Sequence, residues 1–290
     1  MTEQHSPGRT PAHVGVLGGG RMGAGIAHAF VLAGSRVTVV ERDRVAAVAA
    51  GERIHESLRR SIDRGGTEQT FADLAAAVTT GTEAGAFADA GLVIEAVPED
   101  RGLKLDALRR AESALGADGV LATNTSSILV DDLASALERP ARFLGLHFFN
   151  PVPASAMVEV VIGAATEPTL RAAATGWIEA LGKRAVVVRD SPGFASSRLG
   201  VALALEAIRM LEAGVADAAD IDAAMELGYR HPVGPLRTTD IVGLDVRLGI
   251  AEELQATLGE RFAPPRLLRE LVAAGHLGRK SGRGFYEWSD

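Results

Sequence analysis

The feature that most constrains the fold is a short apolar run followed directly by a glycine-rich turn. His13–Leu17 is predicted to be a buried strand, and Met22–Ala33 a helix rich in Ala and Gly. Between them lies Gly18-Gly19-Gly20-Arg21-Met22-Gly23, which has the spacing G-x-G-x-x-G. The first glycine of that spacing permits a tight turn, the second lets a pyrophosphate approach the backbone, and the third lets helix and strand pack closely. The order strand, turn, helix therefore predicts a Rossmann-type dinucleotide site at the start of the helix.

An acidic residue follows the second predicted strand, Arg36–Val40. Glu41 stands 41 − 23 = 18 residues after Gly23, where a carboxylate can accept hydrogen bonds from the adenosine ribose. Because a carboxylate repels a 2′-phosphate, Glu41 favours NAD over NADP. Arg42 and Arg44 leave NADP open, since a nearby Arg accommodates that phosphate, although we expect both to be solvated surface charges. The alternative for the whole motif is a glycine turn that binds nothing, beside an incidental acid.

Strand and helix patterns alternate through the first two thirds of the chain, which predicts βαβ units and a parallel sheet. One long charged stretch, Arg44–Ala77, does not fit the alternation. It is broken at Gly65-Gly66, so we expect a helical hairpin that projects from the sheet. The helix Pro168–Leu181 and five further strands complete the unit, the strands being predicted at Leu92–Val97, Val120–Asn124, Phe143–His147, Met157–Ile162 and Ala185–Val188.

The pattern changes at Ser191-Pro192-Gly193, after which strand-like runs nearly vanish. We expect an α/β Rossmann-type domain over 12–190, an all-α domain over 191–290 and a flexible leader over 1–11. The length of 290 residues also allows a single large α/β domain. The segments with helical spacing in the last part are Phe194–Ala213, Asp217–Leu227, Leu236–Leu258 and Pro265–Ala274.

Composition narrows the classes of function. The chain has 30 Lys and Arg against 37 Asp and Glu, a formal net charge of −7, so no nucleic-acid partner is expected. The absence of cysteine excludes disulfides, thiolate-held metals and cysteine nucleophiles, and we expect no metal site. No apolar run is long enough to cross a bilayer, and the polar start lacks the apolar core of a secretory signal. We therefore expect a cytoplasmic protein with no membrane partner.

A histidine and a glutamate form the candidate catalytic pair. His147 ends a predicted strand, and in this type of sheet the carboxyl ends of strands border the cofactor crevice. If the chain turns at Pro151–Pro153 and returns, Glu159 comes back against His147. A carboxylate bonded to one imidazole nitrogen fixes the tautomer and raises the basicity of the other nitrogen. The alternatives are a structural histidine and a glutamate that faces water from an edge strand.

Together with other motifs, these residues show that the chain is similar to a known family. The chain resembles the L-3-hydroxyacyl-CoA dehydrogenase family, particularly its bacterial 3-hydroxybutyryl-CoA dehydrogenases. The resemblance covers nearly the whole chain from His13 to Trp288. The matching pieces stand in the order VGVLGGGRMGAGIA, VIEAVPED, NTSSI, GLHFFNPVP, MVEVV, SPGF, HPVGPL with TDIVGLD, and GRKSGRGFYEW.

The resemblance implies a role for each matching residue. It makes His147 the general base and Glu159 its partner carboxylate. It also places Ser126 beside the nicotinamide and the substrate, so Ser126 is counted among the catalytic, cofactor-binding and substrate-binding residues. It implies cofactor contacts for Glu99, Lys104, Asn150 and Lys280. In the helical hairpin, Ser57 and Arg64 stand where the family has a serine and a lysine that touch coenzyme A.

Simpler roles remain open for several of these residues. Ser126 can be a helix cap, and Asn150, before a proline, can be a turn residue. Lys104 and Lys280 can be solvated surface charges. The Arg64-for-Lys difference is mild, because Arg also fits an anionic phosphate.

One departure from the family pattern affects the substrate. The family commonly has P-G-F-x-x-N-R where this chain has Pro192-Gly193-Phe194-Ala195-Ser196-Ser197-Arg198. Ser197 therefore occupies the position of an asparagine that lies close to the reacting group, and we count it among the substrate-binding residues. A serine is shorter and lacks the amide, so acyl chain length and preference stay open.

The resemblance implies a reversible, NAD-dependent oxidation of an L-3-hydroxyacyl-CoA, with a short acyl group such as 3-hydroxybutyryl expected, and a homodimer. One alternative is a related dehydrogenase that acts on a free hydroxy acid, of the carnitine or gulonate type. Another is a non-catalytic NAD-binding protein, against which the pair His147 and Glu159 argues.

Overall fold

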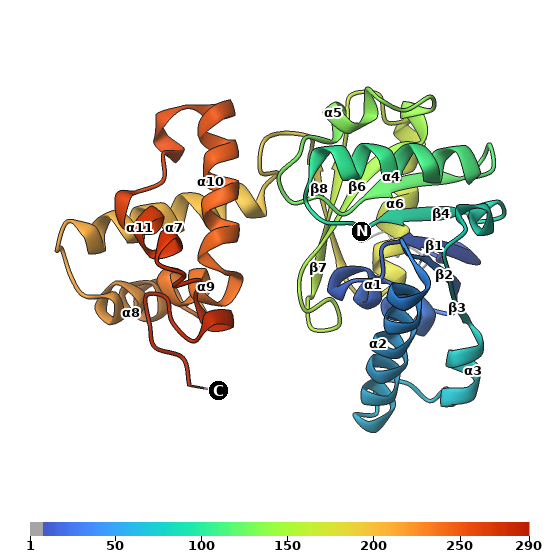
Figure 1. The fold of residues 1–290 in the computed structure, drawn as a ribbon, viewed down its shortest axis with the longest axis horizontal. Coiled ribbons are helices and arrows are strands. Elements are labelled where there is room, and N and C mark those ends of the chain that lie inside the picture. The colour runs from blue at the N-terminus through green and yellow to red at the C-terminus, as the bar shows by residue number, and fades with distance from the viewer. Residues whose placement is uncertain (1–7, 290) are drawn as a thin grey trace, which may run out of the picture. The chain divides into compact units, whose positions relative to one another are not determined.

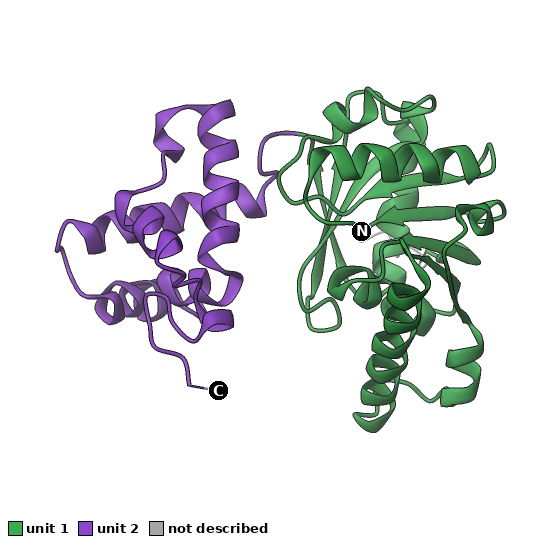
Figure 2. Ribbon diagram, viewed as in Figure 1, with its two compact units in different colours: residues 1–190 green, residues 191–290 purple. Residues whose placement is uncertain are grey.

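The computed structural model describes residues 8–289, which form two compact units that divide between Asp190 and Ser191 (Figure 2). The first unit is built on an eight-stranded sheet and the second is helical. The predicted fold class, a Rossmann-type domain with a helical hairpin followed by an all-α domain, is confirmed. Each unit has an apolar core of its own.

The sheet of the first unit has the strand order β3-β2-β1-β4-β5-β6-β7-β8. The chain leaves β1 (His13–Leu17) in one direction towards β2 (Arg36–Val40) and later returns to β1's other side through β4 (Leu92–Glu95). Right-handed crossovers then place helices on opposite faces, and in Figure 1 α4 lies in front of the sheet and α6 behind it. The reversal of strand order beside β1 creates the crevice in which α/β sheets bind ligands.

The predicted strands and helices correspond closely to the observed ones. The remaining elements of the first unit are α1 (Arg21–Leu32), α2 (Arg44–Asp63), α3 (Phe71–Ala76), β3 (Val78–Gly81), α4 (Arg101–Ala114), β5 (Val120–Thr123), α5 (Val130–Ala134), β6 (Phe143–Phe148), β7 (Met157–Ile162), α6 (Pro168–Ala180) and β8 (Arg184–Arg189), with 3-10 turns at Ala84–Phe87 and Pro140–Arg142.

The sheet is not wholly parallel, which corrects the prediction. β7 runs antiparallel to β6, and β8 runs parallel to β7. The connection between β6 and β7, residues 149–156, is too short for a crossover helix, so the chain reverses directly. That reversal is what returns Glu159 to His147, its partner in the register.

The predicted hairpin is a long helix followed by a short one. Asp43 starts α2 by accepting a hydrogen bond from the Ala46 N–H at 2.8 Å, and Thr70 starts α3 in the same way through the Asp73 N–H. α2 extends away from the sheet, and the chain returns through α3 (Figure 1). It then forms β3, a four-residue strand that the sequence analysis did not predict, because its polar sequence VTTG lacks an apolar run.

The second unit consists of five helices among its described residues. Leu236–Leu258, predicted as one helical stretch, is two helices, because Gly243 adopts φ +109° between them. The elements are α7 (Ser196–Glu212), α8 (Ala218–Tyr229), α9 (Pro235–Val242), α10 (Leu244–Leu258) and α11 (Arg266–Ala273), with 3-10 turns at Glu260–Phe262 and Arg279–Ser281.

Two buried acids tie the C-terminal segment to these helices. Asp240 accepts hydrogen bonds from the Phe285 and Tyr286 N–H groups and from the Trp288 indole. Asp222 caps α9 and also accepts from the Tyr286 hydroxyl at 2.7 Å. Both acids are fully partnered, so their burial is compatible with a stable fold.

Thr10 and Pro11, at the end of the predicted leader, are tied to the first unit, since the Ser35 hydroxyl donates to the Thr10 hydroxyl and to the Pro11 carbonyl. Residues 1–7 of that prediction lie outside the described residues. Within residues 8–289, no helix has the length and apolar character needed to span a membrane.

Candidate active site

Most of the predicted site residues of the first unit gather at the carboxyl edge of five adjacent strands, β2, β1, β4, β5 and β6, whereas Ser57 and Arg64 lie on and just after α2. The loops after these strands contact one another directly. The Gly18 N–H donates to Val40 at the end of β2, and the Ala96 N–H donates to Leu17 at the end of β1. The Asn124 N–H, after β5, donates to the Glu95 carbonyl at the end of β4. A continuous surface of loop backbone therefore runs from the glycine turn towards His147.

The glycine turn has the geometry of a phosphate cradle. Gly18 adopts φ +97°, and a Cβ at Gly23 would lie 1.8 Å from the Gly18 carbonyl oxygen, so neither position accepts a larger residue. A Cβ at Gly20 would meet no described atom within 4 Å, so the space in front of this residue is open. Gly20 is the cap residue before α1, and no side chain caps that helix, which leaves its first N–H groups available to an anion. The turn fits the pyrophosphate of a dinucleotide.

Glu41 is held at the edge of this turn. Its Oε1 accepts from the Gly19 N–H at 2.7 Å, and its Oε2 accepts from the Arg42 N–H at 3.1 Å. A half-buried carboxylate fixed beside the turn is suited to the ribose hydroxyls of NAD and unsuited to a 2′-phosphate. Arg42 is 85% exposed and pairs with Asp43, in line with the surface role expected for it.

A buried ionic cluster, Glu95, Lys104 and Glu99, lies behind the next two loops. Lys104 is 1% exposed, and its ammonium lies 2.9 Å from Glu95 Oε1 and 3.1 Å from Glu99 Oε2. Glu95 is fully buried and also accepts hydrogen bonds from the Val97 N–H and the Thr123 hydroxyl. Lys104 is therefore not a surface charge. Glu95 was not predicted as a site residue, although it lies within an apolar strand, where an ionised group requires a partner.

The two carboxyl groups of the cluster are shifted in opposite directions. Burial raises the pKa of Glu95, and the Lys104 charge only partly offsets this effect. Burial also acts on Glu99, but the Lys104 charge and hydrogen bonds from Thr125 and Ser126 outweigh it and lower the pKa of that carboxyl. Glu99 is therefore the fixed negative charge at the surface of the cluster.

Glu99 organises the turn that contains Ser126. Its Oε1 accepts from the Thr125 hydroxyl at 2.6 Å, the Ser126 N–H at 2.8 Å, and both the N–H and the hydroxyl of Ser127 at 3.0 Å. Ser126 is not a helix cap, because α5 begins at Val130 with Leu129 in the cap position. The predicted contacts of Ser126, Glu99 and Lys104 with cofactor or substrate stay predictions.

His147 and Glu159 face each other across the antiparallel pair β6 and β7. Glu159 Oε2 lies 2.8 Å from His147 Nδ1, with the histidine 5% exposed and the glutamate fully buried. The Phe149 ring lies against the imidazole, with centroids 4.5 Å apart. An ionised Glu159 selects the tautomer with the proton on Nδ1, which places the lone pair on Nε2. The pair has the arrangement of a general base with an orienting carboxylate.

Two asparagines stand near the pair in different settings. Asn124 is buried at the end of β5, and its Oδ1 accepts from the Phe148 N–H at 2.8 Å, which fixes the end of β6. Asn124 was not predicted as a site residue, although it stands in the same NTSSI piece as Ser126. Asn150 is exposed in the turn after β6, so its predicted cofactor contact stays a prediction.

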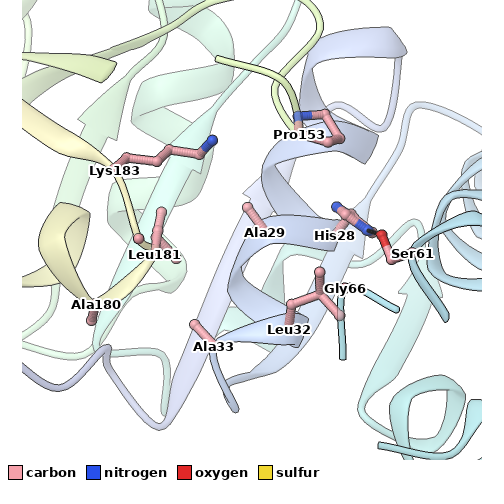
Figure 3. A pocket seen from close by; sticks show the side chains of 11 residues that line it. His28, Ala29, Leu32, Ala33, Ser61, Gly66, Pro153, Ala180, Leu181 and Lys183 are labelled. Carbon is pink, nitrogen blue, oxygen red and sulfur yellow. Dashed lines mark hydrogen bonds between the residues drawn. The ribbon is translucent and has the colours of Figure 1, made fainter. Parts of the chain in front are cut away.

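The predicted coenzyme A residues lie on and just after α2. Ser57 is half-buried and Arg64 is exposed, and their contact with coenzyme A stays a prediction. A pocket of about 390 Å³ lies nearby between α1, the end of α2, the 149–156 loop and the turn that joins α6 to β8 (Figure 3). His28 bonds to Ser61 Oγ in its wall at 2.8 Å, and Lys183 donates to the Val152 and Ser155 carbonyls. Burial, aided by the Lys183 charge, lowers the pKa of His28 to about 4.

Two further predicted residues belong to the second unit. Ser197 is 9% exposed in the first turn of α7. Lys280 is 47% exposed and lies 2.6 and 2.7 Å from the two carboxylate oxygens of Asp245. Among residues 8–289, no group of three or more His, Asp or Glu side chains could hold a metal ion.

Comparison with known proteins identifies the family of this chain. A family model described as 3-hydroxyacyl-CoA dehydrogenase, NAD binding domain, matches residues 13–191, and one described as 3-hydroxyacyl-CoA dehydrogenase, C-terminal domain, matches residues 193–288. A 3-hydroxybutyryl-CoA dehydrogenase of Mycobacterium tuberculosis is 42% identical over 279 residues, which are 95% of this chain and 98% of that protein.

Solved structures give the same result. The crystal structure of M. tuberculosis FadB2 has a TM-score of 0.92 at 41% identity and covers 97% of this chain and 100% of that one. The crystal structure of (S)-3-hydroxybutyryl-CoA dehydrogenase PaaH1 from Ralstonia eutropha has a TM-score of 0.92 at 38% identity, with the same coverage. Two family models that together span the described units, and relatives well above 30% identity, show that the chain belongs to the 3-hydroxyacyl-CoA dehydrogenase family.

Proposed function

We propose that this protein catalyses the reversible, NAD-dependent oxidation of an L-3-hydroxyacyl-CoA to the 3-ketoacyl-CoA. The observation that carries the proposal is the 2.8 Å contact between His147 and Glu159 at the same sheet edge as the glycine turn. A binding protein would need the glycine turn but not this acid–base pair. When bound, NAD supplies the hydride acceptor.

The proton moves through His147. In the oxidation, Nε2 of His147 accepts the proton of the C3 hydroxyl while the C3 hydrogen departs as hydride. Glu159 stabilises the imidazolium that forms, because its negative charge lies against Nδ1. In the reverse direction the imidazolium returns the proton to the developing alkoxide. Such acid–base help contributes roughly 10²- to 10⁴-fold in rate.

The cofactor residues have distinct tasks in this proposal. The first N–H groups of α1 bind the pyrophosphate, and Glu41 binds the adenosine ribose. Glu99 fixes the turn that presents Ser126 beside the reacting centre. Asn150 and Lys280 add contacts on the cofactor side, and Ser57 and Arg64 contact coenzyme A. Support for these roles is the match of these residues to the family pattern, in which Arg64 stands at the position of a lysine.

The finer description is a short-chain enzyme that acts on 3-hydroxybutyryl-CoA in fatty acid metabolism, works in the cytoplasm and forms a homodimer. The substrate is supported by relatives named 3-hydroxybutyryl-CoA dehydrogenase at 42% and 38% identity. The dimer is supported by exposed apolar side chains on the second unit, among them Leu199, Leu227 and Tyr229.

A single assay series tests the proposal. NADH oxidation is followed with acetoacetyl-CoA and with 3-ketoacyl-CoAs of increasing length, and NAD reduction with free carnitine and gulonate. We expect turnover of acetoacetyl-CoA and none of the free hydroxy acids. Turnover of a free hydroxy acid alone would replace the proposal by the related class, and binding of NADH without turnover of any substrate would replace it by a non-catalytic role.

A further inference from the structure

The strand that carries His147 continues past its neighbour on one side. β5 ends at Thr123, and the last residue pair between β5 and β6 is Thr123 with Gly145, two positions before His147. On the other side, β7 still pairs with β6 at both His147 and Phe148. The part of β6 that presents the imidazole therefore has, within residues 8–289, a paired strand on one side only.

A side chain replaces the missing strand on the open side. Asn124 is the first residue after β5, and its Oδ1 accepts a hydrogen bond from the Phe148 N–H at 2.8 Å. Both residues are buried, with exposures of 8% and 2%. A buried N–H requires an acceptor, and because the pairing with β5 has already ended, Asn124 supplies it. The N–H of Asn124 itself donates to the Glu95 carbonyl at 2.9 Å, which ties the residue to β4 as well.

This hydrogen bond acts on the peptide group next to the proposed base. The N–H of Phe148 belongs to the planar peptide that joins His147 to Phe148, so holding it fixes the backbone dihedral ψ of His147 and with it the direction of the side chain. Glu159 holds the ring itself, with its Oε2 2.8 Å from Nδ1. The imidazole is therefore anchored once through its ring and once through its backbone.

Asn124 also begins the loop that contains Ser126. Glu99 holds this loop through the N–H groups of Ser126 and Ser127. One buried side chain therefore joins the loop with Ser126 directly to the strand end with His147, and all of these residues belong to the first unit. The spacing between the two proposed site residues depends on this link.

We propose that Asn124 is a positioning residue for the proton transfer, which holds Nε2 of His147 at a fixed place relative to the Ser126 loop. This inference rests on the proposed function, and it gives Asn124 no contact with substrate or NAD. A misplacement of about 1 Å at a reacting group lowers a rate by roughly 10²-fold, so an anchor of this kind has a strong effect on turnover. The amide suits the task, because it accepts the hydrogen bond without a charge that would compete with Glu159 for the imidazolium.

Asn124→Leu removes the acceptor and keeps a side chain of similar size. We expect kcat for acetoacetyl-CoA reduction to fall by roughly tenfold to 10²-fold. KM for acetoacetyl-CoA and Kd for NADH should change little, since the glycine turn and Glu41 are intact. Fluorescence titration with NADH gives both Kd and the number of sites per chain, and this number should stay at the wild-type value. Loss of folded protein would lower the number of sites, so the titration separates the two causes.

The solvent deuterium isotope effect on kcat reports on the proton step. It should rise in Asn124→Leu, because a misplaced imidazole slows proton transfer relative to the other steps. Asn124→Asp keeps an oxygen at the same position and should recover most of the lost kcat. If Asn124→Leu does not fold, Asn124→Ser, whose shorter side chain cannot reach the Phe148 N–H directly, takes its place in the comparison.

Thr166→Val is a matched control at the opposite end of the same strand. The Thr166 hydroxyl donates to the Phe143 carbonyl at 2.7 Å and accepts from the Gly163 N–H at 3.0 Å, so this substitution also breaks buried hydrogen bonds at β6. It should lower the unfolding temperature and leave kcat and the isotope effect at their wild-type values.

Three outcomes would contradict the inference or its basis. An unchanged kcat and isotope effect in Asn124→Leu would overturn the positioning role, and so would an equal loss of kcat in Thr166→Val. A raised Kd for NADH with an unchanged isotope effect would assign Asn124 to the cofactor site and would also overturn it. Failure of the wild-type enzyme to reduce any 3-ketoacyl-CoA would instead overturn the proposed function.

Discussion

The two units differ in whether a buried cation has a partner of opposite charge. In the first unit, Lys104 is surrounded by Glu95 and Glu99, and its ammonium also lies 3.4 Å from the Val97 carbonyl. In the second unit, Arg247 is 9% exposed, against 1% for Lys104, and it has no hydrogen-bond or ion-pair partner among the described residues. Both are cations removed from water, but only one of them has its counter-charge within the chain.

The difference lies in the hydrogen bonds and ion pairs that the folded chain offers to each cation. The Lys104 cluster is complete in the folded chain, and it links β4, α4 and the Ser126 turn through bonds that require no ligand. It is therefore a frame that sets the shape of the cofactor edge. Arg247 has no such set of bonds, since its buried Nε has no hydrogen-bond partner among the described residues. Substitutions that remove one charge at a time can test this contrast.

The largest effect is expected from Lys104→Met. The substitution leaves the fully buried Glu95 without its counter-charge, and breaking a buried pair in this way typically costs about 3–5 kcal/mol of unfolding free energy. Urea unfolding at pH 7 measures it. Arg101→Met, in the same helix, breaks an exposed pair with Asp132 and should cost less than about 1 kcal/mol. Equal losses of unfolding free energy in the two variants would contradict the role of the Lys104 cluster as a structural frame.

The next largest effect, a loss of turnover, is expected at the catalytic pair of His147 and Glu159. His147→Gln should lower kcat for acetoacetyl-CoA reduction by roughly 10²-fold or more, because it removes the general acid–base group. The affinity for NADH, measured by fluorescence titration, should change little, since the glycine turn and Glu41 are intact. Near-normal turnover in a folded His147→Gln protein would exclude this residue from the proton transfer.

Sequence patterns were sufficient to predict the parts of the molecule that depend on residues close together in the chain. The glycine turn, Glu41 and the strand positions follow from residues close together in the chain, and the predicted bounds of β1, β2 and β7 are those observed. β3 was missed because an edge strand with one polar face carries no apolar run.

Contacts between distant residues were harder to predict. Glu95 and Lys104 stand nine positions apart in different elements, and only the packing of α4 on the sheet reveals that they meet. The isolation of Arg247 is also invisible in the sequence, because Asp245, two residues away, pairs with Lys280 instead. Partner choice among charges depends on the three-dimensional arrangement, which a linear pattern does not contain.

His28 is a third buried titratable side chain. It differs from Lys104 and Arg247 because burial keeps it neutral. Its folded pKa of about 4 lies below the ordinary value of 6.5, so between these values the unfolded chain binds more protons than the folded one. Its contribution to stability is therefore lost as the pH falls from 6.5 to 4, by roughly 2 kcal/mol between pH 7 and pH 5.

His28→Gln removes the titrating group and keeps a side chain that can hydrogen-bond to Ser61. Urea unfolding of wild type and variant at pH 7 and pH 5 should show that the variant loses about 2 kcal/mol less over this range. Parallel pH dependence in the two proteins would mean that His28 is protonated in the folded state, in contradiction to its lowered pKa.

The smallest effect on stability is expected at Lys280, the exposed counterpart of Lys104. Both members of its pair with Asp245 are 40% or more exposed, so Lys280→Met should cost less than about 1 kcal/mol of unfolding free energy. If the family role of Lys280 holds, however, the same substitution should raise KM for NADH about two- to fivefold, since a surface charge contact contributes up to about 1 kcal/mol. Arg279→Met removes the neighbouring charge and serves as the control. An unchanged KM in Lys280→Met would leave Lys280 as a surface charge that pairs only with Asp245. A raised KM would show that a weakly held surface lysine, unlike the buried Lys104, exchanges its partner when cofactor binds.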